Sequence, residues 1–146
     1  MQEDFYSPRA NADGTYDTFT VEHDGGIDLV TLNRPESLNS MSRTMMLELQ
    51  HYFGALYTNQ DVRVVLLTGA GRGFCAGLDL KEDRSDERGG VVAGMRTQRR
   101  VSEIMMRMRR APQPIVSLIN GPASGGGFGM ALASDIRIAL RGAKMN

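Results

Sequence analysis

The stretch GPASGGGFGM, residues 121–130, decides the fold, because three consecutive glycines stand directly before a short apolar run. Glycine loses more backbone freedom on folding than any other residue, so Gly125, Gly126 and Gly127 together are costly unless another group must approach the bare backbone. The stretch lies between two apolar runs, which predicts a turn between a strand and a short helix. We therefore expect this turn to contact something that side chains would exclude.

The composition of the chain excludes several classes of protein. Its 146 residues suit one domain, and 17 basic side chains balance 17 acidic ones, so charge gives no reason to expect a nucleic acid or an anionic membrane as partner. No stretch approaches the roughly 18 apolar residues of a membrane span. The single cysteine, Cys75, cannot form an internal disulfide, which favours a reducing compartment and predicts a cytoplasmic protein. One cysteine and two distant histidines predict no metal site.

Apolar residues at strand spacing lie on both sides of the glycine stretch. Side chains alternate with period two around Asp24-Gly25-Gly26, which predicts a β-hairpin. Further strands are expected within residues 62–71, 114–121 and 135–140. The alternating set of the hairpin is Phe19, Val21, Ile27, Leu29 and Thr31.

Two longer helices are predicted between these strands, so the fold class is α/β with crossover connections. Ser42 is of the residue type that caps a helix, and apolar residues follow it at spacings of three and four: Met46, Leu49, Phe53 and Leu56. The second helix covers residues 91–111 and ends at Pro112. Its apolar face is Val101, Ile104, Met105 and Met108, and its basic face is Arg96, Arg99, Arg100, Arg107 and Arg110.

Two phosphate-binding interpretations of the glycines fail on residues that carry the mechanism. Gly121 and Gly126 have the separation of a P-loop, but Gly127-Phe128 stand where Lys and Ser/Thr are required. The earlier turn GAGRGF, residues 69–74, has Phe74 where the dinucleotide pattern needs Gly or Ala.

A serine nucleophile at Ser124 is also poorly supported. Pro122 replaces the first glycine of the nucleophile-elbow pattern, and the pattern needs a histidine further along the chain. Both histidines, His23 and His51, precede the serine.

An oxyanion hole fits the glycines better. Backbone N–H groups at a helix N-terminus have no intrahelical partners and lie at the positive end of the helix dipole. Glycine lets a carbonyl oxygen approach them, and each such donor contributes about 3–4 kcal/mol to an oxyanionic transition state. The natural source of a second donor is GFCAGLDL, residues 73–80, after the other glycine-rich turn.

Three motifs together resemble the enoyl-CoA hydratase/isomerase, or crotonase, superfamily. They are TLNRPESLNSMS (31–42), RGFCAGLDLKE (72–82) and INGPASGGGFGMALASDIRIA (119–139). The resemblance implies an α/β crotonase-like ββα spiral core, truncated before a C-terminal helical part that makes trimer contacts. It divides the chain into a flexible arm over residues 1–14 and an incomplete acyl-CoA-binding core over residues 15–146.

The resemblance also implies a site and a ligand. The backbone N–H groups of Leu78 and Gly126 would hold the thioester oxygen of an acyl-CoA. Main-chain groups around them would contact coenzyme A, and no separate cofactor is implied because coenzyme A belongs to the substrate. Members of the family assemble as trimers or dimers of trimers. The residues implied in coenzyme A binding are Ser37, Leu38, Ala76, Leu78, Asp79 and Leu80.

One departure from the family pattern bears on the reaction. Hydratases of the family have a catalytic glutamate three residues beyond the donor glycine, where this chain has Gly129. The family's second acid would follow residue 146. Hydration conventionally needs two carboxylates, so proton transfer between carbons by a single acid is easier to support. The alternative is a non-catalytic acyl-CoA-binding or assembly paralogue.

Several residues have simpler interpretations. Cys75 is expected to be a small buried side chain and Asp79 a structural hydrogen-bond acceptor. The arginine face is expected to be solvated, with attraction of the coenzyme A phosphates as the alternative. The methionines near residue 105 are expected in the core rather than in an acyl pocket, and His23 is expected to be exposed and inert.

Overall fold

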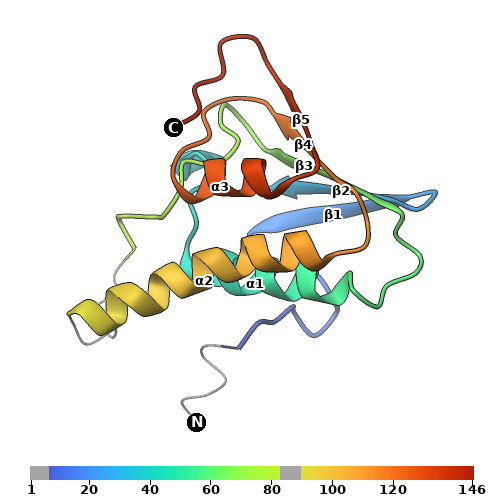
Figure 1. Cartoon of the computed structure of the whole chain (residues 1–146), viewed down its shortest axis with the longest axis horizontal. Helices are drawn as coiled ribbons and strands as arrows, with labels where there is room; N and C mark the ends of the chain where they lie inside the picture. Colours follow the sequence, from blue (N-terminus) through green and yellow to red (C-terminus); the bar gives the residue numbers. More distant parts are fainter. Residues whose placement is uncertain (1–6, 83–89) are drawn as a thin grey trace.

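The structure, a computed structural model, describes residues 7–82 and 90–146, so the first six residues of the predicted arm lie outside the described residues. Five strands and three α-helices follow one another in it (Figure 1), and the predicted α/β class is confirmed. The strands are β1 (Phe19–Asp24), β2 (Ile27–Leu32), β3 (Val64–Gly69), β4 (Ile115–Ile119) and β5 (Ile136–Ala139). The helices are α1 (Arg43–Ala55), α2 (Val91–Arg110) and α3 (Gly126–Ala133), with a short 3₁₀ helix, η2 (Pro35–Ser37), before α1.

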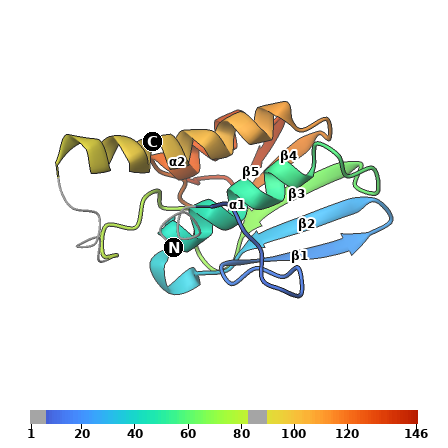
Figure 2. The same ribbon diagram turned by 90° about the horizontal axis from the view of Figure 1, so that it is seen from below.

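The five strands form one sheet in the order β1-β2-β3-β4-β5. β1 is antiparallel to β2, and every later pair is parallel. Each parallel connection carries one helix, and right-handed crossovers that advance in one direction put all their helices on one face of the sheet. Figures 1 and 2 show this helical layer, with α2 between α1 and α3.

The hydrophobic core lies between the helical layer and the sheet. Its largest fully buried side chains come from β1, β2, β3, α1, α2 and the loops, and they include Phe19, Leu32, Met46, Leu49, Phe53, Leu67, Phe74 and Ile104. Ser42 caps α1 as predicted, because its hydroxyl accepts the Met45 N–H at 3.1 Å. Packing in this core holds the strands in place, including the strand ends that carry the candidate site.

The predicted hairpin is present, but β2 buries the opposite face from the one expected. Gly25 and Gly26 have positive φ values of 56° and 86°, as a tight two-residue turn requires. Asp28, Val30 and Leu32 are buried, whereas Ile27 is 44% exposed. The prediction was wrong because Leu29 and Val30 are adjacent apolar residues, so the strand can be read in either phase.

Asp28 is buried because two side chains hydrogen-bond its carboxylate. His23 Nδ1 lies 2.7 Å from Asp28 Oδ1, and the Tyr52 hydroxyl donates to Oδ2 at 2.7 Å. His23 is exposed as expected, but it is not without a role, because its ring pairs with the Asp28 carboxylate. Burial and the Asp28 carboxylate together raise the pKa of Tyr52 far above its ordinary value, so this hydroxyl stays a donor.

The two ends of the helical layer differ in how well they are covered. The first turns of α2 extend beyond the sheet (Figures 1 and 2), and Val91, Val92 and Met95 are exposed there. At the other end, β5 is an edge strand with Ile136 and Ile138 exposed. Among the described residues no helix is long and apolar enough to cross a membrane.

Candidate active site

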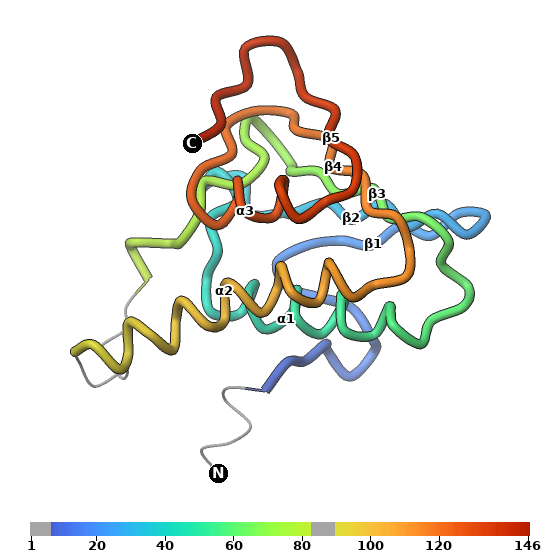
Figure 3. The backbone as a smooth tube through the Cα atoms, in the orientation of Figure 1, coloured from blue at the N-terminus to red at the C-terminus, as the bar shows by residue number. Residues whose placement is uncertain are grey.

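Two loops at the carboxyl ends of neighbouring parallel strands lie side by side. One follows β3 and runs to Leu78, and the other follows β4 and runs into α3 (Figure 3). The N–H groups of Phe74 and Cys75 both donate to the Pro122 carbonyl, at 3.1 and 3.2 Å, and Ser124 N–H donates to the Cys75 carbonyl at 3.0 Å. Carboxyl ends of parallel strands are where open α/β sheets usually bind ligands.

The contact between these loops requires glycine on both sides. A Cβ atom at Gly127 would lie 2.1 Å from the Cys75 carbonyl oxygen. A Cβ atom at Gly77, where φ is +88°, would lie 2.7 Å from the Ser124 oxygen and 3.5 Å from the Gly126 nitrogen. The two loops are therefore in direct backbone contact, and the chain segments that carry Leu78 and Gly126 adjoin.

Two backbone N–H groups at this junction have no acceptor among the residues that the structure describes. Within residues 7–82 and 90–146, neither Leu78 N–H nor Gly126 N–H donates a hydrogen bond to a protein atom. Their neighbours are bonded: Gly125 N–H donates to the Asn146 carbonyl at 2.8 Å, and Gly127 N–H donates to the Ser124 carbonyl at 2.9 Å. Gly126 is also the first residue of α3, where the helix dipole is positive.

The side chains facing Gly126 and Gly129 are apolar. A Cβ atom at Gly126 would lie 3.0 Å from Met41 Sδ and 3.1 Å from Val101 Cγ1. One turn further along α3, a Cβ atom at Gly129 would lie 2.8 Å from the terminal methyl of Met105. The Cβ positions of Gly126 and Gly129 therefore face apolar side chains from α2 and from Met41, which precedes α1.

The residues expected to bind coenzyme A lie in two segments that the fold connects. Ala76 N–H donates to the Leu38 carbonyl at 3.0 Å, and Leu78 forms a parallel bridge with Met41. The Ser37 hydroxyl is turned inward to the Arg34 carbonyl at 3.1 Å. Leu80 lies beyond this junction and is 88% exposed.

Asp79 is a structural group in this arrangement, as predicted. Its Oδ1 accepts the Lys81 N–H at 3.0 Å and its Oδ2 accepts Arg34 Nη2 at 2.9 Å. Burial alone would raise the pKa of Asp79, but these hydrogen bonds and the Arg34 charge outweigh it and hold the pKa below its ordinary value. The carboxylate is therefore ionised, and both of its oxygens are hydrogen-bonded. It can hold in place the chain segment around Leu78, the preceding residue.

Cys75 is the buried side chain that the sequence predicts. The residue is fully buried, and burial raises the pKa of its thiol to about 11. A thiol with that pKa is a poor nucleophile at neutral pH. Ser124 has no histidine partner among the described residues, and its hydroxyl donates to Asn146 Oδ1 at 2.7 Å.

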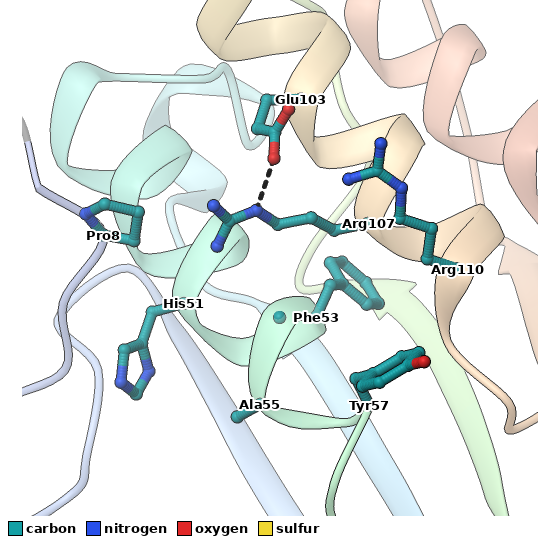
Figure 4. A pocket seen from close by; sticks show the side chains of 9 residues that line it. Pro8, His51, Phe53, Ala55, Tyr57, Glu103, Arg107 and Arg110 are labelled. Carbon is teal, nitrogen blue, oxygen red and sulfur yellow. Dashed lines mark hydrogen bonds and ion pairs between the residues drawn. The ribbon is translucent and has the colours of Figure 1, made fainter.

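Part of the arginine face of α2 is bonded to other groups of the protein. Arg107 donates through Nε to Glu103 and through Nη1 to the Gln50 carbonyl, both at 2.8 Å. It lines a cavity of about 480 Å³ between α1 and α2, together with His51, Tyr57 and Arg110 (Figure 4). None of the candidate site residues lines that cavity. Arg96, Arg99 and Arg110 are exposed, as expected of a solvated face.

Three polar residues that hold the loops together were not identified from sequence. Arg34, Asn39 and Asn120 all lie within the quoted motifs, but the sequence shows neither their partners nor their burial. Arg34 pairs with Asp79, 45 positions along the chain. The two asparagines bond to carbonyl groups of the loop after β3. Asparagine close to a glycine-rich turn often hydrogen-bonds the turn backbone, and this pattern could have pointed to the two asparagines.

Comparison with known proteins identifies the family of this chain. The family model described as enoyl-CoA hydratase/isomerase matches residues 22–146. A probable peroxisomal enoyl-CoA hydratase 1 of Arabidopsis thaliana is 42% identical over 120 residues, which cover 82% of this chain and 43% of that protein. The 1,2-epoxyphenylacetyl-CoA isomerase of Escherichia coli is 40% identical over 128 residues, covering 86% and 49%.

Solved structures place the fold in the same group. The crystal structure of an enoyl-CoA hydratase from Mycobacterium smegmatis superposes with a TM-score of 0.83 at 31% identity, covering 88% of this chain and 50% of that one. The chain spans about half the length of the relatives it matches. The crotonase fold that the motifs predict is thereby confirmed for the part of the fold that this chain covers.

Proposed function

The chain belongs to the enoyl-CoA hydratase/isomerase family, and from that premise we propose that the protein transforms acyl-CoA thioesters on the N–H groups of Leu78 and Gly126. The observation that carries the proposal is that neither N–H has an acceptor within the described residues, although the loops around them are bonded to each other. Buried backbone donors are rarely left without partners, and both of these donors belong to partly buried residues. Two of them on adjoining segments are explained if the ligand supplies the acceptor.

The thioester oxygen is that acceptor in the proposed mechanism. As a proton leaves the carbon next to the carbonyl, negative charge develops on the oxygen, and preset donors stabilise the charge without reorganising. Each donor contributes about 3–4 kcal/mol to the transition state. The positive end of the α3 dipole adds to the Gly126 donor.

We favour transfer of a proton between carbons over addition of water. In such an isomerisation one group removes a proton from one carbon, the double bond shifts, and a proton returns to another carbon. Hydration instead conventionally needs two carboxylates. Gly129 supplies none, and the side chain nearest to it is that of Met105. The names of the relatives include both a probable hydratase and an isomerase. They support a reaction on an acyl-CoA but do not favour hydration over isomerisation.

The same proposal assigns the rest of the ligand. Coenzyme A would bind along the main chain of Ser37–Leu38 and Ala76–Leu80. The sequence favours a core role for Met105, but Met105 and Val101 are only partly buried, so we propose that an apolar acyl group lies against them. We also propose a trimer or a dimer of trimers, on the family resemblance. The proposed compartment is the cytoplasm, because the one cysteine is a buried free thiol. An Arabidopsis relative is named as peroxisomal.

Two assays of the whole protein test the activity and the reaction. With a 3-enoyl-CoA, isomerisation creates the conjugated enoyl absorbance, and with a 2-enoyl-CoA, hydration removes it. We expect the first reaction to be the faster. Faster loss of the conjugated absorbance from the 2-enoyl-CoA would overturn the preference for isomerisation.

One observation favours a second candidate, an acyl-CoA-binding or assembly paralogue without activity. It is the absence of a side chain at Gly129, where a hydratase would carry its acid. Tight binding of acyl-CoA with no turnover in either assay would support this candidate and contradict the first.

A further inference from the structure

The turn that precedes the Leu78 segment is held by two asparagine side chains from different parts of the chain. The turn covers residues 69–73 and begins at Gly69, the last residue of β3. Asn39 precedes α1 and Asn120 follows β4, so the two residues approach the turn from separate segments. Both donate to the same carbonyl, that of Gly73.

Asn39 is fully buried and has a left-handed backbone, with a φ of 56°. Its Nδ2 donates to the carbonyls of Ala70 and Gly73, both at 2.9 Å. Its Oδ1 accepts the Arg34 N–H at 2.8 Å. The amide therefore connects the turn to the loop that carries the Arg34–Asp79 ion pair.

Asn120 bonds the other side of the turn. Its Nδ2 donates to the carbonyls of Gly69 at 2.7 Å and Gly71 at 3.1 Å, as well as to Gly73 at 3.3 Å. Its Oδ1 accepts the Gly69 N–H at 3.2 Å. A single side chain thus fixes both ends of a five-residue turn.

The segments that carry the asparagines also fix the chain between the turn and Leu78. The Leu38 carbonyl, next to Asn39, accepts the Ala76 N–H. The Pro122 carbonyl, two residues after Asn120, accepts the N–H groups of Phe74 and Cys75. The position of the Leu78 N–H relative to Gly126 therefore depends on where these two segments hold the turn.

We infer that Asn39 and Asn120 are positioning residues that aim the Leu78 N–H at the ligand oxygen. The inference rests on the proposed function, because it gives the Leu78 N–H a ligand to meet. It requires the amide group specifically, since Nδ2 donates to carbonyl oxygens in every case. Aspartate has the same shape but would set a carboxylate against two or three carbonyl oxygens.

The test uses Asn120→Asp and Asn39→Asp in the whole protein, with Asn33→Asp as the matched control. Asn33 is exposed, and its side chain makes no hydrogen bond with the described residues. The probe is an aryl-conjugated enoyl-CoA such as cinnamoyl-CoA, whose absorption moves to longer wavelength when hydrogen bonds polarise its carbonyl. Its dissociation constant is measured in the same titration, and folding is checked by cooperative thermal unfolding.

We expect the wild-type protein and Asn33→Asp to give the full shift. Asn120→Asp should lose most of the shift and about 10- to 100-fold in kcat, the range expected when a donor is misplaced rather than removed. Its dissociation constant for the probe should change by less than about threefold, since coenzyme A contacts supply most of the binding. Lowering the pH should restore part of the shift, because a protonated aspartate can donate one hydrogen bond.

Two results separate failure of the inference from failure of the proposed function. A full shift in folded Asn120→Asp and Asn39→Asp would overturn the inference while leaving the proposed function standing. No shift in the wild-type protein would overturn the proposed function itself. If an aspartate variant does not fold, Asn120→Ser, which removes the amide without adding charge, is measured by the same criterion.

Discussion

Two regions of the molecule differ in how their polar groups are bonded. Between β1, β2 and α1 they are paired: Glu48 accepts the N–H groups of Asp17 and Thr18, and Tyr52 donates to Asp28. At the ends of β3 and β4, the N–H groups of Leu78 and Gly126 are left without acceptors within the described residues. The first region contributes to stability, because satisfied buried groups hold the fold together.

The difference shows where binding is to be sought. The cavity beside Arg107 holds none of the candidate site residues, and the Arg107 guanidinium in its lining is already bonded to Glu103 and to the Gln50 carbonyl. The two free N–H groups lie instead where loop backbones touch and only glycine fits. Backbone donors that are held in place and have no protein acceptor can stabilise charge on a ligand, so we look for the ligand at these two N–H groups rather than in the cavity.

The largest effect is expected from adding a methyl group where the two loops touch. Gly127→Ala would place Cβ 2.1 Å from the Cys75 carbonyl oxygen, so the loops must separate. We expect the free energy of unfolding to fall by about 3 kcal/mol, at the upper end for overpacking. The measurement is urea unfolding of the whole protein.

Gly94→Ala is the matched control, because Gly94 is also a helical glycine but a Cβ atom there meets no atom within 4 Å. This change should stabilise the protein by up to about 1 kcal/mol, the helix preference of alanine over glycine. Equal effects of the two substitutions would contradict the described contact between the loops.

A smaller loss of stability is expected from the paired region. Glu48→Gln sets an amide group against the backbone donors of Asp17 and Thr18, and we expect a loss of about 2 kcal/mol in the free energy of unfolding. The absorption shift of bound cinnamoyl-CoA should not change, since this network lies outside the site. Glu22→Gln, at an exposed position on β1, should alter neither quantity. A lost shift in Glu48→Gln would show that the two regions are not separable.

The next effect concerns which acyl groups the protein accepts. Met105→Ala opens the wall beside Gly129, so kcat/KM for a bulkier acyl-CoA should rise by about tenfold relative to a short one, the scale of one side-chain contact in an apolar pocket. Met106→Ala is the control, because Met106 is 46% exposed on another face of α2. The same selectivity in both variants would remove Met105 from the acyl site.

The smallest effect is the dependence of stability on acid. Hydrogen bonding to the Ile115 N–H, opposed by burial and aided by Arg109, lowers the pKa of Asp135, and the pKa of Asp79 is lowered as well. A carboxylate with a lowered folded-state pKa stabilises the fold above its ordinary pKa and loses that contribution as the pH falls through the folded value. The free energy of unfolding should therefore decline below about pH 4. Asp79→Asn should show a shallower decline, and an unchanged slope would contradict the described ion pair.

Much of the fold could be predicted from local patterns. The hairpin, the Ser42 cap, the two long helices and the turn before α3 each depend on residues close together in sequence. The buried face of β2 could not be predicted, because Asp28 is buried only through partners elsewhere, among them Tyr52, 24 positions away. Period-two alternation cannot indicate such a partner.

The site could be predicted only in part, for the same reason. Glycine spacing and the family motifs indicate which turns matter. They do not show that the Gly125 and Gly127 N–H groups are bonded while the Gly126 N–H is free, because hydrogen-bond acceptors are set by tertiary contacts. The asparagines that hold the turn after β3 were missed because their acceptors are backbone carbonyls 31 to 51 positions away.

The central claim is tested most directly by a crystal structure of the whole protein with a bound acyl-CoA, in which two distances are measured from the thioester oxygen. We predict that the oxygen lies about 3 Å from both the Leu78 and the Gly126 nitrogen, the length of a hydrogen bond. An acyl-CoA bound with its thioester oxygen away from either nitrogen would contradict the account.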